Sequence, residues 1–104
     1  MALAKPPVQD NAYAAAIALL ERAPLIDGHN DLPYVIRMSR NAGGDVAAYD
    51  LSRVHEEVDT DIPRMKAGML AAQFFAAYVP PNHKHPAGFA LAQIALMRDI
   101  LRLH

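Results

Sequence analysis

The chain has 104 residues, of which 53% are hydrophobic and 20% charged, and its formal net charge is −1. This composition excludes an acidic or Ser/Gly-rich disordered tail, and the balanced charge excludes a basic surface for nucleic acid. Because there is no cysteine, disulfides are excluded, and any metal site has to use histidine and carboxylate ligands. The length suits one small domain.

The first predicted element is a helix that begins after a cap at Asp10 or Asn11 and runs to about Ala23. Apolar residues recur on one face at helical spacing, namely Tyr13, Ala16, Ile17 and Leu20. Pro24 ends the helix, because a proline disfavours helical geometry in the residue before it.

The apolar stretch within this helix could also be the core of a signal peptide. Only Lys5 precedes it as a basic residue, and Glu21 and Arg22 follow it at once, so a helix is the better interpretation. No run reaches the roughly 20 apolar residues that a membrane span needs. We therefore expect a cytoplasmic protein without a membrane segment.

Short elements follow in the middle of the chain. Residues 25–27 are a short apolar strand, residues 32–40 form a helical turn after Pro33, and residues 41–50 are a loop with two glycines. Asp61 is the expected cap of a short helix that ends at Gly68.

The run 70–79 is apolar on both of its alternating faces. Such a strand belongs inside a parallel sheet that is covered on both sides. A buried helix is the competing interpretation, since alanine-rich runs are ambiguous. The adjacent Phe74 and Phe75 and the stop at Val79-Pro80-Pro81 favour the strand.

After a loop over 80–86, residues 87–103 predict a helix. Its expected apolar face holds Ala90, Ile94, Met97 and Leu101. The order of elements is the opening of an alternating α/β pattern. Two strands alone leave unpaired edges, so we expect them to pair with strands from a continuation of the chain or from another chain.

The sharpest chemical signal is His29 and Asp31, two residues apart at the end of the first strand. In extended backbone, residues i and i+2 point to the same side, so imidazole and carboxylate should converge. Both are suitable zinc ligands. Gly28 is expected to allow a sharp turn. An ordinary polar turn stays open as the alternative, because spacing alone identifies no third ligand.

Other polar residues carry weaker signals. His83 and His85 lie in the loop after the second strand, where a solvated loop is favoured over a metal site, and His55 and His104 are expected at the surface. Gln73 is polar within an apolar strand and needs a hydrogen-bond partner if it is buried. Asp27 is a candidate for orienting a ligand of the metal.

Three separated blocks resemble the membrane (renal) dipeptidase family of zinc metallopeptidases, within the amidohydrolase-like metal-dependent barrels. The first, residues 25–33, reads LIDGHNDLP and is similar to the family's first strand and metal motif. The second, residues 61–68, is similar to the segment before the second strand, and residues 72–80 are similar to that strand itself. The blocks occur in the family's order, and the resemblance covers roughly residues 12–104.

The resemblance implies the opening units of a TIM-like (β/α)₈ barrel, incomplete in this chain, with first strands at about 25–27 and 70–79. Members hold two zinc ions and cleave dipeptides by metal-bound hydroxide. It implies that His29 and Asp31 bind one zinc. Tyr34 stands where some relatives carry an aromatic residue beside the substrate. The bridging glutamate and two further histidines are expected beyond His104, and no catalytic residue is assigned here.

The chain over 1–104 is therefore interpreted as the N-terminal segment of a zinc-dependent dipeptidase, inactive when isolated. The alternative is a non-catalytic remnant that folds by association, and a homo-oligomer is one form of it. A third hypothesis is another metal hydrolase of the wider superfamily. Many of those carry His-x-His after the first strand, and Asp31 favours the dipeptidase branch.

Overall fold

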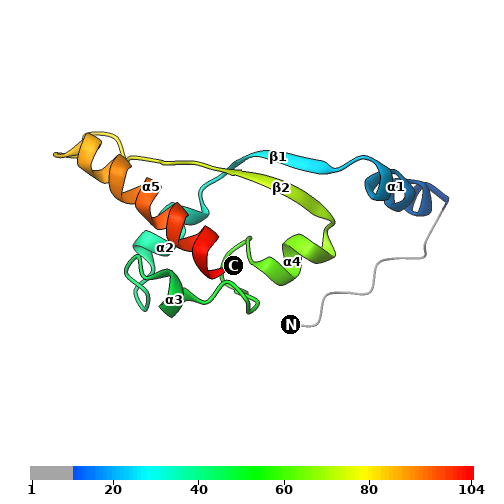
Figure 1. The fold of residues 1–104 in the computed structure, drawn as a ribbon, viewed down its shortest axis with the longest axis horizontal. Coiled ribbons are helices and arrows are strands. Elements are labelled where there is room, and N and C mark those ends of the chain that lie inside the picture. The colour runs from blue at the N-terminus through cyan, green and yellow to red at the C-terminus, as the bar shows by residue number, and fades with distance from the viewer. Residues whose placement is uncertain (1–10) are drawn as a thin grey trace.

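A computed structural model describes residues 11–104, and the predicted cap Asp10 lies outside them. The described chain is a mixed α/β structure whose two strands form one parallel pair (Figure 1). The elements, in chain order, are α1 (Asn11–Arg22), β1 (Leu25–Asn30), α2 (Leu32–Met38), α3 (Val46–Tyr49), α4 (Ile62–Ala67), β2 (Leu70–Phe75) and α5 (Pro86–Leu103).

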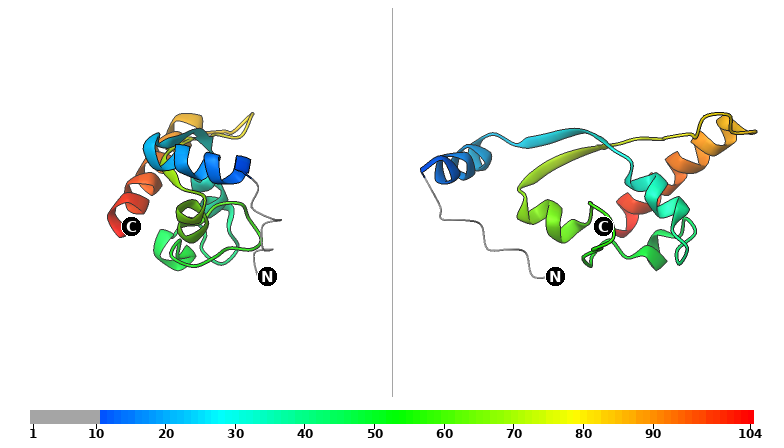
Figure 2. Two further views of the ribbon diagram at one scale, coloured as in Figure 1. Left: turned by 90° about the vertical axis from the view of Figure 1, so that its right-hand side faces the viewer. Right: turned by 180° about the vertical axis from the view of Figure 1, so that it is seen from behind.

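Helix α1 ends where Pro24 predicts, but its apolar face has little to pack against. It has no buried residue, and Ile17 and Leu20 are only half-buried. Figures 1 and 2 show α1 at one end of an elongated molecule, beyond the start of the sheet. The helix therefore depends on local propensity more than on packing against a core.

The sheet consists of β1 and β2 running parallel, as the βα order predicts. Strand β1 is longer than the expected 25–27 and reaches Asn30, whereas β2 stops at Phe75 instead of continuing to residue 79. The last bond between the two segments is donated by the Ala76 N–H to the Asn30 carbonyl, at 2.9 Å. Pairing ends there because β1 turns into α2.

The hydrophobic core lies between α2, α3 and α5, below the sheet in Figure 1. Ile36 of α2 is completely buried at its centre. The other core residues are Leu32, Val46, Tyr49, Leu51, Leu96 and Ile100. Phe75 packs against this cluster from the end of β2, which connects the sheet to the helices.

Helix α5 has the expected limits, but the predicted inner face is wrong. The buried residues are Gln93, Leu96 and Ile100, whereas Ile94 and Leu101 are exposed. The helix carries apolar residues on more than one side, so periodicity cannot choose the side that meets the core. The buried Gln93 is held by Arg37, whose Nε donates to the Gln93 Oε1 at 2.8 Å.

The predicted loop 41–50 contains a short helix, α3, that begins after Asp45. The Asp45 carboxylate accepts bonds from the backbone N–H groups of Ala47 and Ala48, at 2.9 and 3.3 Å. Asp61 caps α4 in the predicted way and accepts from the Arg64 N–H at 2.9 Å. Both caps satisfy backbone donors that a helix start otherwise leaves unpaired.

Asp45→Ala is expected to lower the free energy of unfolding by about 1 kcal/mol, the usual cost of losing a helix cap. Asp45 is exposed, and its side chain bonds to the two N–H groups of the cap, so little else is lost. Urea unfolding of the 104-residue chain, followed by circular dichroism, measures the change. Asp45→Asn keeps a capping oxygen and should restore most of the stability.

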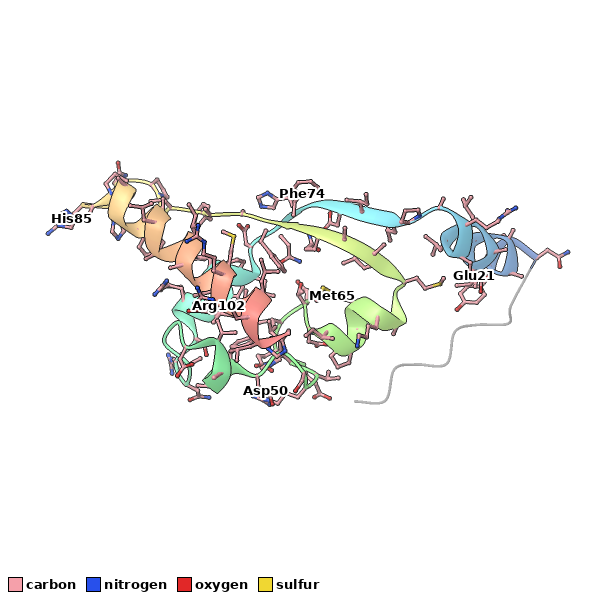
Figure 3. All side chains as sticks on the ribbon, viewed as in Figure 1. Glu21, Asp50, Met65, Phe74, His85 and Arg102 are labelled. Atoms are coloured by element: carbon pink, nitrogen blue, oxygen red, sulfur yellow. The ribbon has the colours of Figure 1, made fainter. Side chains whose placement is uncertain are left out.

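The described residues do not show a closed barrel, and the sheet is open on one face. Phe74 is 65% exposed and lies on the side of the sheet away from the helices (Figure 3). The expectation that the second strand is covered on both faces is therefore not met within residues 11–104. None of the helices in this part of the chain has both the length and the apolar character that crossing a membrane requires.

Candidate metal centre

His29 and Asp31 lie at the carboxyl end of β1, and their side chains meet. The His29 Nε2 and the Asp31 Oδ2 are 3.2 Å apart, as the i, i+2 spacing predicts. His29 lies within the strand, and Asp31 is the residue between β1 and α2. Their side chains are 69% and 47% exposed, so both remain accessible to a ligand.

A bulge in β1 contains His29, the first residue of this pair. Asp27 lies opposite Gln73, and Asn30 lies opposite Phe75, so three steps along β1 match two steps along β2. The extra residue interrupts the ladder in the segment that contains His29. Bulges of this kind redirect side chains and are frequent beside active sites.

Gly28 lies in this bulge, but its backbone does not use the conformational freedom of glycine that was expected to allow a sharp turn. Its backbone is outside the left-handed region, and a Cβ atom at this position would meet nothing within 4 Å. Gly44 differs, because its φ is +91° and a Cβ would lie 2.8 Å from the Arg37 Nη1. The backbone at the candidate metal motif therefore changes direction at the bulge, and position 28 does not require glycine.

Gly28→Ala is expected to stabilise the chain by roughly 0.4–1 kcal/mol, because alanine restricts the unfolded chain and fits the native backbone. Gly44→Ala should instead destabilise it by more than about 1 kcal/mol, through the positive φ and the clash with Arg37. Parallel denaturant titrations of the two variants check the contrast. Destabilisation by Gly28→Ala would contradict the unstrained geometry of the bulge.

The geometry of the pair fits one zinc ion. Two ligand atoms about 2.0–2.1 Å from a tetrahedral zinc lie about 3.3 Å apart, close to the observed separation of 3.2 Å. Neutral imidazole and ionised carboxylate are also the right chemical donors. Among residues 11–104, however, no group of three or more histidine or acidic side chains could hold a metal ion. Within the described residues, the candidate site therefore consists of this pair alone.

A hollow lies directly beside Asp31. It has a volume of about 330 Å³ and opens between the start of α2 and the loop 57–60. Glu57 lines it, and its pKa lies below its ordinary value, first because its own backbone N–H donates to the carboxylate and then because the His55 ring does. The wall of the hollow therefore carries negative charge at neutral pH.

Tyr34 lies in the first turn of α2 and packs in an aromatic cluster. Its ring meets the edge of Tyr78 at a centroid distance of 4.9 Å and lies 6.4 Å from Phe89. The His83 ring lies 4.7 Å from the Phe89 ring, so this loop histidine packs against α5. Figure 3 places His85 at the far tip of this loop.

Sequence reasoning did not anticipate the polar bonds around the bulge. Asn30, between the two candidate ligands, donates from Nδ2 to the Thr60 Oγ1 at 2.9 Å and to the Gln73 Oε1 at 3.3 Å. Gln73 donates from Nε2 to the Asp27 Oδ2 at 2.9 Å. The predicted partner for Gln73 therefore exists, and the Asp27 carboxylate bonds to Gln73.

The expectation that His55 lies at the surface is wrong. Its side chain is 1% exposed, stacks on the Tyr49 ring at 4.0 Å, and bonds through Nε2 to the Asp50 carbonyl at 2.9 Å. A histidine can be buried when its polar atoms have such partners. These partners, Tyr49 and Asp50, form no recognisable pattern with His55 in the sequence.

A histidine–carboxylate pair at the carboxyl end of a parallel strand is the arrangement expected of an α/β metal-dependent enzyme. The chain belongs to the membrane dipeptidase family (peptidase family M19), whose model matches residues 13–104. It is 37% identical over 86 residues to dipeptidase 3 of Rattus norvegicus and to that of Mus musculus, which covers 80% of this chain. It is 44% identical over 79 residues to the dipeptidase ataJ of Aspergillus terreus, covering 73% of this chain.

These alignments cover 17–18% of the length of the relatives. The chain therefore spans less than a fifth of the length of these relatives.

Proposed function

We propose that this chain forms the first part of a zinc-dependent dipeptidase barrel and that His29 and Asp31 bind one zinc ion of its active site. The single observation that carries the proposal is the pair itself, 3.2 Å apart at the carboxyl end of β1. Barrel enzymes build their active sites at that end of the strands. The remaining ligands have to come from residues outside the described set.

The residues of the pair have separate roles in this proposal. His29 offers a nitrogen lone pair, and Asp31 offers a negative charge that offsets part of the charge of the metal. A bound zinc ion lowers the pKa of its water to about 7 and polarises a carbonyl group. The proposed substrate is a dipeptide, and Tyr34, whose ring packs against that of Tyr78, is the proposed contact for its side chains.

The test is hydrolysis of a panel of dipeptides by the complete enzyme, with and without prior removal of metal by a chelator. We expect cleavage that the chelator abolishes and that zinc restores. The isolated 104-residue chain should show no cleavage above background. Cleavage by the isolated chain that survives His29→Ala would contradict the proposal.

A second candidate is an association-dependent module without its own catalysis. The observation that favours it is the exposed apolar surface of the described chain, including Phe74, Leu91 and Leu101. A parallel pair with open edges tends to add strands from another chain. Light scattering of the purified chain distinguishes the two, since this candidate requires a defined oligomer that Phe74→Lys disrupts.

A further inference from the structure

We infer that Asn30 and Gln73 are positioning residues that hold the His29–Asp31 pair ready for a metal ion, an assignment that rests on the proposed function. Asn30 lies between the two ligands in sequence, yet its amide is directed to other segments. Its Oδ1 accepts from the Leu32 N–H at 2.8 Å and closes a turn around Asp31. Since Leu32 is the first residue of α2, this bond fixes the backbone on both sides of Asp31.

The other half of the Asn30 amide ties the ligand segment to two distant parts of the chain. Its Nδ2 donates to the Thr60 Oγ1, thirty residues away, and to the Gln73 Oε1 on β2. Both amide hydrogens and one acceptor site are therefore used. The side chain anchors the end of β1 to β2 and to the loop that lines the hollow beside Asp31.

Gln73 completes the arrangement by spanning the bulge. Its Oε1 accepts from Asn30 at one end of the bulge, and its Nε2 donates to the Asp27 Oδ2 at the other. His29 lies between these two anchored residues. Because a bulge removes ladder bonds locally, side-chain bonds have to fix the backbone there instead.

The pair cannot fix its own geometry. An exposed ion pair contributes little to stability, since water screens the charges and two side chains lose freedom. A metal ion is bound more tightly when the protein has already ordered its ligands, and groups that only orient ligands are typically worth 10–100-fold in affinity or activity. Amides suit this role, because each one both donates and accepts without adding a charge beside Asp31.

The experiment is a titration of the 104-residue chain with Co²⁺ as a paramagnetic probe, read by NMR from the broadening of the His29 imidazole signals. Gln73→Met removes both bridging bonds with little change of size and is expected to weaken Co²⁺ binding about tenfold. Gln93→Met is the matched control, because Gln93 is a buried glutamine whose side-chain oxygen accepts a hydrogen bond from Arg37 on α2. The Gln93→Met variant should lower the stability of the chain but leave its affinity for Co²⁺ unchanged.

Thermal unfolding of each variant separates positioning from loss of structure. Weaker Co²⁺ binding by Gln73→Met than by Gln93→Met, at similar melting temperatures, supports the inference. Equal affinities of wild type and Gln73→Met overturn it and leave the proposed function intact. Binding that is unchanged in His29→Ala places the metal elsewhere, which overturns the proposed function and the inference with it. If Gln73→Met does not fold, Thr60→Val removes one acceptor of the Asn30 amide and is expected to weaken binding several-fold.

Discussion

In the proposed zinc-dependent dipeptidase, His29→Ala is expected to reduce kcat/KM for dipeptides by more than about 100-fold, beyond the range for groups that only orient ligands. The variant removes one of the two donors that lie 3.2 Å apart and leaves Asp31 as a single carboxylate. A zinc ion held by fewer ligands is bound weakly and is not fixed in place. Steady-state kinetics together with the zinc content of the purified variant measure the effect.

The control for this prediction is His85→Ala. His85 is an exposed histidine at the tip of the loop before α5 (Figure 3). The His85→Ala variant should retain full activity and full zinc content. A His29→Ala enzyme that keeps its zinc and most of its activity would show that the motif is an ordinary polar turn.

Local signals in the sequence predict much of the secondary structure correctly. Pro24 ends α1, Asp61 caps α4, and Gly68 follows its last residue. Each of these depends on one residue and on the backbone beside it, which is information that the sequence holds directly. The parallel pairing of the two strands follows in the same way from their separation by helices.

Features that depend on distant segments are predicted poorly. The length of β2 is set by β1, which leaves the sheet after Asn30, so the apolar pattern up to Val79 overstates the strand. The inner face of α5 is the one that packs against α2 and α3, and it carries Leu96 and Ile100. His55 is buried by partners that surround it only after the chain folds.

The candidate site shows the same division between local and distant information. The convergence of His29 and Asp31 follows from the spacing of residues in extended backbone, and the structure places the two side chains together. The bonds that order them come from Asn30, Gln73 and Thr60, and two of these three are more than 25 residues from the pair. A polar Gln73 within an apolar strand was the one signal that such a partner existed.

The loop between α3 and α4 is organised by a buried charge, Asp61. The carboxylate is completely buried and accepts bonds from the His55 N–H, from the Arg64 N–H and from the Arg64 Nε, at 3.0, 2.9 and 2.6 Å. Arg64 continues the network by donating from Nη2 to the carbonyls of His55 and Val58. Asp61 therefore combines a helix cap, a salt bridge and a loop anchor in one side chain.

Asp61→Ala is expected to lower the free energy of unfolding by about 3 kcal/mol, because it removes a buried acceptor and leaves the N–H groups of His55 and Arg64 without their partner. That is about three times the cost of Asp45→Ala, which removes a cap alone. Urea titrations of both variants provide the comparison. Equal losses in the two would show that Asp61 acts only as a cap.

The same residue predicts a dependence on pH. Burial raises the pKa of Asp61, but hydrogen bonds from the backbone of His55 and Arg64 and the charge of Arg64 outweigh it, so the pKa lies below its ordinary value of 3.8. A carboxyl group with a lowered pKa in the folded state stabilises the fold above its unfolded pKa, and this contribution disappears as the pH falls through the folded value. The stability difference between wild type and Asp61→Asn should therefore be constant from about pH 5 to about pH 7, because this range begins about one pH unit above the unfolded pKa. Below about pH 4 the difference should shrink. A difference that grows on acidification would mean that Asp61 is protonated in the folded chain.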